Sequence, residues 1–421
     1  MKFTRVFAFL ALAGMAGSAF ATNGYFSHGY GMKSKGMAGA ATASSDDAFG
    51  GANNPASMAF AGDRLDLGVD LFNPNRSAER TGLGPLDMSV DSDSEYFFVP
   101  EFGMTKQMSS TLALGVTVYG NGGMNTDYAG GQINCGFGPA NMLCGQGDLG
   151  VDLIQLIVAP TVAFKVAPNH SIGVSPLLGY QAFEANGLQM FGLISSDPNK
   201  LTNNGHDDAF GYGVRIGYMG KITPTVTIGA AYASKMDFEE FDEYAGLFAE
   251  QGDFDIPENY NLGVAWQATP TFKLALDYQR ISYSDVASIA NASLVPFPLG
   301  ADNGPGFGWQ DIDVWKLGAE YKFSQQLTLR AGWNHGDNPI TSDNVTFNII
   351  APGVIEDHLT LGFTYTQASG NELTMSYMHG FSNDVSGASI LPVFGGAPAP
   401  MGTETIEMDQ NALGIQYSWK M

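Results

Sequence analysis

Few residues of this 421-residue chain have the types and the spacing that covalent or metal chemistry requires. Its six histidines stand in no recognisable nucleophile motif, so we expect no lipase, no protease and no other enzyme. Its two cysteines, Cys135 and Cys144, have no histidine or further cysteine nearby that could complete a metal site. We therefore expect no metal and no cofactor. Export to an oxidising compartment would instead favour a disulfide between the two cysteines.

Three basic residues have a setting in which they could bind a carboxylate. Arg215, Lys316 and Arg330 lie in segments whose residues alternate between large apolar types and small or polar types. Each basic residue is on the small or polar side, where a partly dry cation could hold an anion. The same side also carries acidic residues, so a network of ion pairs is the alternative interpretation: Asp66, Asp70, Asp277 and Glu320.

The elements that must position these side chains are β-strands with two different faces. At the end of the chain, large apolar residues share one parity and the residues between them are small or polar: Leu413, Ile415, Tyr417, Trp419 and Met421. A period of two indicates a strand between two different solvents. The pattern predicts fourteen strands, at 63–73, 95–106, 111–120, 150–166, 170–186, 208–221, 224–236, 256–268, 271–284, 310–323, 326–336, 355–369, 371–382 and 408–420.

The connections between these predicted strands alternate between short and long. The long ones are 74–94, 121–149, 187–207, 237–255, 285–309, 337–354 and 383–407. An even number of strands, with tight turns at one end and long loops at the other, is typical of bacterial outer-membrane barrels. We therefore predict an all-β fold in which residues 63–421 form a fourteen-stranded antiparallel transmembrane β-barrel. A secreted soluble β-protein is the alternative.

The start of the chain and its net charge restrict its location and its partners. Lys2 and Arg5 precede a short apolar stretch, and the Ala-Phe-Ala sequence at 19–21 offers a small-residue cleavage site. These features predict a signal peptide over residues 1–21. The formal net charge of −23 argues against a nucleic-acid partner. We expect a multi-pass barrel in the outer membrane of a Gram-negative bacterium, and a monomer, because a closed barrel has no free edge.

Residues 22–62 precede the first predicted strand and are too long for a simple lead-in. The segment is rich in Gly, Ala, Ser and Met, and it contains aromatic residues that are costly to leave in water. A fourteen-stranded barrel is wider than an eight-stranded one, whose side chains can fill the interior. We predict that this segment is an N-terminal hatch that plugs the lumen. A flexible periplasmic tail is the alternative.

Several segments of the chain are similar to those of a known family. Residues 22–31 (Thr-Asn-Gly-Tyr-Phe-Ser-His-Gly-Tyr-Gly) resemble the mature start of the FadL/TodX family of outer-membrane transporters. Further similar segments are 35–40, Asp46-Asp47, the hatch motif Asn54-Pro55-Ala56, 119–128 and 252–258. The resemblance implies a barrel of fourteen strands with an N-terminal hatch. It also implies uptake of long-chain fatty acids or, in one branch, aromatic hydrocarbons.

The resemblance further implies a route for the ligand. The ligand would land in an apolar groove between outer loops, pass to a pocket beside the hatch and leave sideways through the wall at a kinked strand. Such a route keeps an apolar solute out of water. Tyr244, Leu247 and Phe248 would form the loop groove, unless they serve only loop packing. The glycines that could mark the kink, or simply begin a loop, are Gly120, Gly122 and Gly123.

The pocket beside the hatch would combine aromatic residues with cations for a fatty-acid carboxylate. The candidates are Tyr25, Phe26, Phe49, Arg215, Lys316 and Arg330. Packing of the hatch and a network of ion pairs are the alternative roles. We expect a hydrophobic small molecule as substrate, with outer-membrane lipids, lipopolysaccharide and the barrel-assembly machinery as partners. Uptake of aromatic hydrocarbons or alkanes and a general porin remain alternatives, although a hatch argues against a porin.

Overall fold

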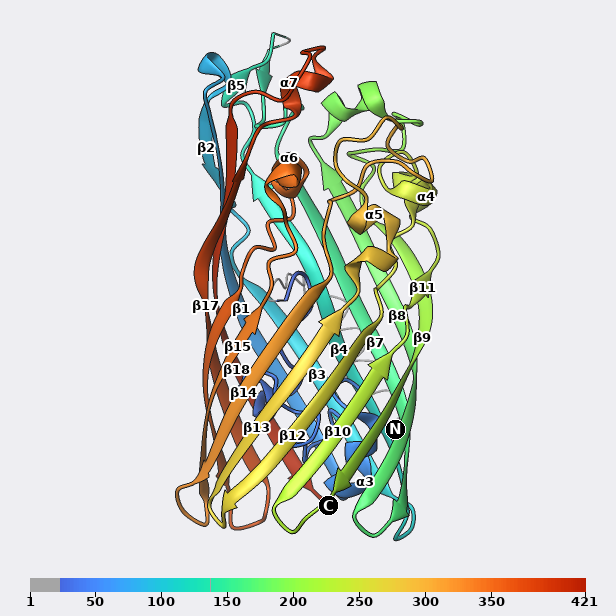
Figure 1. Ribbon diagram of the computed structural model, residues 1–421, viewed down its shortest axis with the longest axis vertical. Helices are drawn as coiled ribbons and strands as arrows, with labels where there is room; N and C mark the ends of the chain where they lie inside the picture. Colours follow the sequence, from blue (N-terminus) through green and yellow to red (C-terminus); the bar gives the residue numbers. More distant parts are fainter. Residues whose placement is uncertain (1–22, 137) are drawn as a thin grey trace, which may run out of the picture.

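Fourteen long strands form the wall of a closed antiparallel barrel, which confirms the predicted fold class (Figure 1). The computed structural model describes residues 23–136 and 138–421, so the predicted signal peptide lies outside the described residues. The wall strands are β1 (Arg64–Thr81), β3 (Phe97–Gln107), β4 (Leu112–Tyr128), β7 (Leu149–Ala167), β8 (His170–Asn186), β9 (Asp207–Lys221), β10 (Val226–Ala233), β12 (Asn259–Thr269), β13 (Phe272–Ile281), β14 (Ile312–Lys322), β15 (Leu327–Gly336), β16 (Asp357–Thr366), β17 (Glu372–Gly387) and β18 (Thr403–Lys420). Each pairs with its neighbours in chain order, and β18 pairs with β1 to close the barrel.

The remaining elements are short. β2 (Met88–Asp91) extends the edge of β1, β11 (Asp237–Phe238) pairs with β9, and β5 (Ile133–Asn134) pairs with β6 (Pro139–Ala140). The helices are α2 (Met32–Lys35), α3 (Met58–Ala61), α4 (Ala249–Gly252), α5 (Ala287–Ala290), α6 (Val345–Asn348) and α7 (Leu391–Phe394). Single 3₁₀ turns cover Pro55–Ser57, Gly84–Leu86, Gln189–Ile194, Asp242–Tyr244, Tyr283–Asp285 and Ser342–Asn344. Within the described residues, no helix has both the length and the apolar character needed to cross a bilayer.

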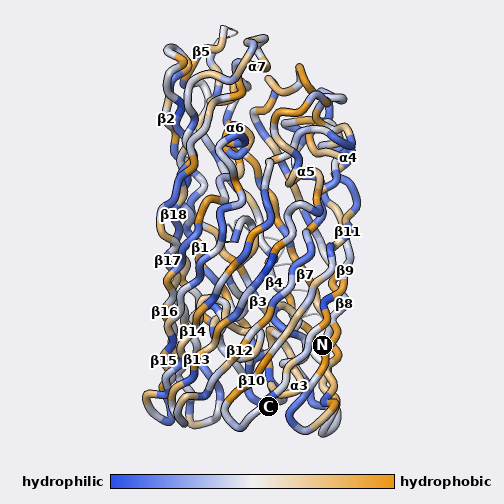
Figure 2. The backbone as a smooth tube through the Cα atoms, viewed as in Figure 1, coloured by the Kyte–Doolittle hydropathy of each residue, from blue (hydrophilic) through white to orange (hydrophobic). Residues whose placement is uncertain are grey.

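The wall strands have one face toward the lumen and one toward the outside. In β16, Leu359 and Leu361 are 47% and 53% exposed, whereas His358 and Thr360 are fully buried. Hydrophobic and hydrophilic residues alternate in this way along the strands (Figure 2). An outward apolar row with a polar interior is the pattern of a barrel in a bilayer.

The two ends of the barrel differ, and three strands extend further than the alternation predicts. Tight turns join the strands at one end, and the long connections and short helices gather at the other (Figure 1). β1 continues to Thr81, β4 continues to Tyr128 and β18 begins at Thr403, so parts of the predicted loops 74–94, 121–149 and 383–407 are strands. Above the bilayer the outward face meets water, so backbone pairing persists after the alternation has ended.

Residues 23–62, here called the N-terminal segment, lie inside the barrel and are almost entirely buried (Figure 1). Inward carboxylates of the wall accept hydrogen bonds from its backbone. Asp277 accepts from the N–H groups of Ala41 and Thr42 at 2.9 and 2.8 Å, and Glu101 accepts from that of Gly31 at 3.1 Å. These bonds satisfy backbone groups of a segment that has little secondary structure of its own.

The predicted hatch motif ties this segment to the wall. The Asn54 side chain accepts from the backbone N–H of Ala56 at 3.1 Å, which caps the turn that Pro55 begins. Its amide nitrogen also donates to the carbonyls of Thr42 and Tyr218, at 2.7 and 2.9 Å. One asparagine therefore fixes a turn, a neighbouring turn and a wall strand at once.

Candidate functional site

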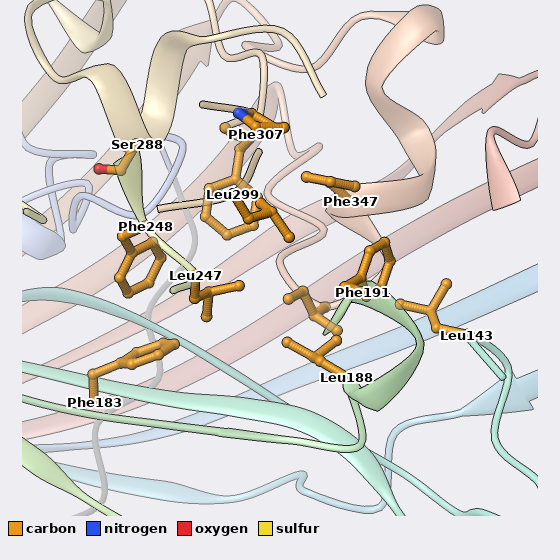
Figure 3. A pocket seen from close by; sticks show the side chains of 13 residues that line it. Leu143, Phe183, Leu188, Phe191, Leu247, Phe248, Ser288, Leu299, Phe307 and Phe347 are labelled. Atoms are coloured by element: carbon orange, nitrogen blue, oxygen red, sulfur yellow. The ribbon is translucent and has the colours of Figure 1, made fainter. Parts of the chain in front are cut away.

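An apolar cavity of about 40 Å³ lies among the outer loops. Its lining comes from the wall and from several long connections, whose side chains converge on one space (Figure 3). No charged side chain is among the described lining residues, which are Leu143, Phe183, Leu188, Phe191, Leu247, Phe248, Ser288, Leu299, Pro305, Gly306, Phe307, Phe347 and Ile350. The site favours a ligand without exposed polar groups at this position.

Aromatic packing defines the shape of this outer cavity. The ring centroids of Phe183 and Phe248 are 4.7 Å apart, and Phe191 lies 5.3 Å from both Phe347 and Phe394. An engineered cavity that holds benzene measures about 150 Å³. The outer cavity is smaller, so even a single ring enters only if these side chains move.

Two of the three predicted groove residues line the outer cavity. Leu247 and Phe248 are in its lining, whereas Tyr244 lies beside it. The Tyr244 ring packs edge-on against Phe183 at 4.8 Å, and its hydroxyl donates to the carbonyl of Gly205 at 2.6 Å. Tyr244 therefore supports the wall of the cavity from behind.

A second cavity, of about 20 Å³, lies between the N-terminal segment and the wall. It is mostly apolar, but one charged side chain, that of Arg76, contributes to it. Its described lining is Tyr25, Phe72, Pro74, Arg76, Gly123, Met124, Asn125, Trp309, Ala351, Pro352, Gly353 and Met408. This inner cavity therefore offers apolar surface together with a cation, which the outer cavity does not.

A chain of aromatic rings connects the two cavities. Phe183 and Phe248 line the outer cavity, and the Phe248 ring lies 4.8 Å from that of Phe254. Phe254 lies 6.2 Å from Tyr25, which lines the inner cavity together with Trp309. Aromatic pairs at these distances form continuous van der Waals contact. An apolar path therefore runs from the outer loops to the N-terminal segment.

The predicted aromatic residues of the pocket lie in different places. Tyr25 lines the inner cavity, and Phe26 stacks on Tyr25 at 5.2 Å. The Tyr283 hydroxyl accepts a hydrogen bond from the Tyr25 backbone N–H and donates one to the carbonyl of Asn23, which fixes this cluster. Phe49 packs against Gly31 elsewhere in the N-terminal segment and lines neither of the two cavities.

None of the three predicted cations lines the outer or the inner cavity. Arg215 donates to the carbonyls of Gly51 and Ala52, and Lys316 donates to the carbonyl of His28 at 3.1 Å. Arg330 forms an ion pair with Glu320 at 2.7 Å, and Lys273 pairs with the same carboxylate at 3.1 Å. The positions of these side chains match the alternative interpretation of a network that joins wall and N-terminal segment.

Buried ion pairs hold the N-terminal segment to the wall. The ammonium group of Lys35 lies 2.6 Å from Asp70 and 2.7 Å from Glu101, and all three side chains are buried. Burial lowers the pKa of Lys35, but the two carboxylates outweigh burial and raise the pKa above its usual value. Lys33 bridges Asp46 and Glu372 at 3.0 Å each.

The predicted kink glycines surround a β-bulge in β4. The pairing of β4 with β7 shifts register between Gly120 and Gly122, which leaves Asn121 as the extra residue. The Asn121 carbonyl accepts from the backbone N–H of Ser27 at 3.1 Å. A Cβ on Gly122 would lie 1.7 Å from the Tyr25 carbonyl oxygen, so only glycine allows this close approach. Gly123 lines the inner cavity.

The wall has a gap in its hydrogen-bond ladder beside this bulge. β3 and β4 pair only from Phe102 with Val118 to Gln107 with Ala113. Beyond that point β3 continues to pair with β1, and β4 continues to pair with β7. Pro100 lies in β3 just past the end of the ladder, and proline cannot donate a ladder hydrogen bond. The sequence signal for this gap is therefore the proline.

The two cysteines form a disulfide in the outer loop that carries β5 and β6. Their Cα atoms are 5.7 Å apart. Leu143, the residue before Cys144, lines the outer cavity. The disulfide therefore fixes a loop that contributes a wall of that cavity.

The sequence interpretation missed most of the outer cavity and the cation of the inner one. Phe191 and Phe347 lie in predicted long loops, where their apolar character was the available signal. Arg76 lies just past the predicted end of the first strand, in the predicted loop 74–94, so parity did not assign it to a face. Contacts across the barrel, which no local pattern encodes, bring these residues to their cavities.

A closed antiparallel barrel with an apolar outer row and a buried N-terminal segment defines a bacterial outer-membrane transport protein. The family model described as outer membrane protein transport protein (OMPP1/FadL/TodX) matches residues 8–389. The chain belongs to this family, whose members are outer-membrane transporters of hydrophobic compounds. Comparison with curated protein sequences gave no match.

Solved structures of related barrels share the fold. The toluene transporter TodX of Pseudomonas putida is 19% identical, with a TM-score of 0.69 over 95% of this chain and 100% of that one. A FadL homologue of Pseudomonas aeruginosa is 15% identical, with a TM-score of 0.70 over 94% and 99% of the two chains. The toluene transporter TbuX of Ralstonia pickettii is 17% identical, with a TM-score of 0.64 over 94% and 99%.

Proposed function

We propose that this protein is a channel for passive uptake of long-chain fatty acids or similar hydrophobic molecules. Capture occurs in the outer cavity, transfer occurs to the inner cavity beside the N-terminal segment, and release occurs sideways through the wall. The observation that carries the proposal is the chain of rings from Phe183 through Phe248 and Phe254 to Tyr25. It gives an apolar molecule continuous contact from the outer loops to the wall gap.

In this proposal the N-terminal segment is a hatch that blocks an aqueous path. Its buried ion pairs and the carboxylates that bind its backbone support that role. A general porin needs an open aqueous lumen and is therefore disfavoured. Residues 22–62 act as the hatch and residues 63–421 as the barrel, and neither has a catalytic role.

The wall supports further proposed partners. The outward apolar row would contact outer-membrane lipids, with lipopolysaccharide around the loops, and the barrel-assembly machinery would insert the chain. The closed wall supports a monomer. Uptake of neutral aromatic hydrocarbons is the second candidate function, because the lining of the outer cavity carries no charged side chain among its described residues. Two of the similar structures are described as toluene transporters.

Uptake in Gram-negative cells that lack their own fatty-acid channel tests the proposal. Labelled oleate and labelled toluene are supplied separately to cells with and without the protein, and folded barrel in the outer membrane is quantified. We expect saturable uptake of at least one compound and little ion conductance in planar bilayers. Background uptake of both compounds by the folded barrel would overturn the proposal, and large steady conductance would favour the porin.

A further inference from the structure

Arg76 is a buried cation without a counterion in the described part of the structure. Its side chain extends from β1, and the residue is 5% exposed. No described carboxylate lies within ion-pair distance of its guanidinium, and its Nε has no hydrogen-bond partner. The buried arginines Arg64, Arg80 and Arg330 each pair with a carboxylate instead. Burying an unpaired charge is costly, so this arrangement calls for an explanation.

The partners that Arg76 does have lie on both sides of the wall gap. Its guanidinium donates to the carbonyl of Asn125 in β4 and to the carbonyl of Ser94, which precedes β3. It also donates to the Ser92 hydroxyl at 3.3 Å. Over this stretch β3 and β4 do not pair with each other. The Arg76 side chain therefore replaces ladder hydrogen bonds as the connection across the gap.

Arg76 also stands between the inside of the barrel and its surroundings. It lines the inner cavity together with Phe72 and Asn125. Asn125 and Ser94 also line a polar crevice of about 420 Å³ on the other side. A molecule that left the inner cavity toward this crevice would have to displace the guanidinium from the two carbonyls.

A carboxylate is the group best suited to displace it. Guanidinium and carboxylate form two parallel charge-assisted hydrogen bonds, which are stronger than bonds to neutral carbonyls. Such an ion pair would also give the free Nε a partner. Turning toward the ligand would withdraw the guanidinium from Asn125 and Ser94 and leave the gap without its connection.

We propose that Arg76 is both the recognition residue for a carboxylate on an apolar ligand and the latch of the wall gap. Ligand binding in the inner cavity exchanges the two carbonyl partners for the carboxylate, and the gap then widens for lateral release. This inference rests on the proposed uptake function. It makes hydrophobic carboxylates the preferred substrates over neutral molecules of the same shape, because only a carboxylate opens the latch.

Decanoate and 1-decanol test the recognition, since they share a chain length and differ in the head group. Uptake of both is measured in cells that contain the wild-type barrel or the Arg76→Gln variant. We expect Arg76→Gln to lower decanoate uptake about tenfold, the typical value of a lost hydrogen bond to a charged group. Uptake of 1-decanol is expected to stay within about twofold, since it makes no ion pair.

Arg215→Gln is the matched comparison, because Arg215 is a buried arginine that donates to backbone carbonyls but lines neither cavity. A selective loss of decanoate uptake in Arg215→Gln but not in Arg76→Gln would overturn the proposal. An equal loss of both probes in Arg76→Gln would also overturn it. If the wild-type barrel takes up 1-decanol but not decanoate, the uptake function stands and this inference fails. Background uptake of both would refute the uptake function and the inference together.

The latch is tested without altering Arg76. Spin labels are attached to Tyr96→Cys and Asp127→Cys, two exposed positions that flank the gap, and their distance is measured in the purified barrel. We expect decanoate, but not 1-decanol, to lengthen this distance. The conservative Arg76→Lys variant, which keeps the charge, should fold and show a smaller response. An unchanged distance in wild type at saturating decanoate would overturn the latch.

Discussion

The hatch end of the lumen and the outer-loop end are held together by different forces. Around the N-terminal segment, ion pairs and hydrogen bonds connect each buried charge to named partners, as Lys35 connects to Asp70 and Glu101. Around the outer cavity, apolar and aromatic side chains such as Phe183 and Phe191 pack together. Directional bonds specify one position, whereas apolar contacts tolerate a change of shape.

This difference matches the two tasks in the proposed route. A hatch must not drift in the lumen, because a displaced segment would open an aqueous path. A capture site must open, because its cavity of about 40 Å³ is too small for a ring. The inner cavity lies between the two regions and has features of both, with Trp309 and Met408 as apolar surface and Arg76 as a cation.

The strongest way to break the comparison is to remove one charge from the network around the N-terminal segment. Lys35→Met leaves Asp70 and Glu101 as uncompensated buried carboxylates. We expect a loss of about 3–5 kcal/mol in the free energy of unfolding, the usual cost of breaking a buried pair. Denaturant unfolding of the purified barrel, followed by tryptophan fluorescence, measures it.

A surface pair supplies the control for this prediction. Lys106 pairs with Asp63, but the Lys106 side chain is 53% exposed. Lys106→Met should change the free energy of unfolding by less than about 1 kcal/mol, because exposed ion pairs contribute little. Equal effects of the two substitutions would show that the network around Lys35 has no special structural role.

An aromatic truncation in the outer cavity tests the other side of the comparison. Phe191→Ala removes a ring that contacts Phe347 and Phe394. We expect a loss of unfolding free energy below the about 3–5 kcal/mol that the change costs in a rigid core, since the loops can close around the space. The substrate concentration for half-maximal uptake should rise up to about tenfold, equivalent to about 1.4 kcal/mol.

Leu361→Ala is the control for the cavity truncation, because Leu361 is 53% exposed on the outside of β16 and lines neither cavity. It should leave the half-maximal concentration unchanged. A Phe191→Ala barrel with unchanged uptake at low substrate concentration would show that the outer cavity does not capture substrate.

The smallest expected effect is a pH dependence of the loop that carries Phe248 and Phe254. Burial, together with the neighbouring charge of Asp255, raises the pKa of Asp253 to about 7, although Lys235 opposes the shift. The unfolded loop loses this proton near pH 4 and the folded loop keeps it until about pH 7. Loop stability should therefore fall as pH rises from about 4 to about 7, and stay constant above.

Amide hydrogen exchange of residues 241–256 at pH 5 and pH 8, corrected for the intrinsic rate, checks this prediction. Asp253→Asn should remove the difference between the two pH values. Asp237→Asn, at an exposed position, should preserve it. Greater protection at pH 8 than at pH 5 in wild type would contradict the assigned sign.

The sequence predicted the wall better than it predicted the cavities. The alternation that ends in Trp419 and Met421 requires only that each residue know its face, so the fourteen strands were predictable. The upper parts of β1 and β4 were assigned to loops, since their pairing continues where the alternation does not. Tyr25, Leu247 and Phe248 line cavities, whereas Phe49 does not.

The sequence by itself determined the class of fold, because a membrane-spanning strand must satisfy its lipid face and its lumen face residue by residue. It also determined that the N-terminal segment differs in composition from the wall. Only the tertiary structure decided which cation meets which carboxylate. Lys35 finds Asp70 and Glu101, whereas Arg76 finds two carbonyls across a gap in the ladder. Those partners lie far apart in the chain, and barrel closure rather than local pattern brings them together.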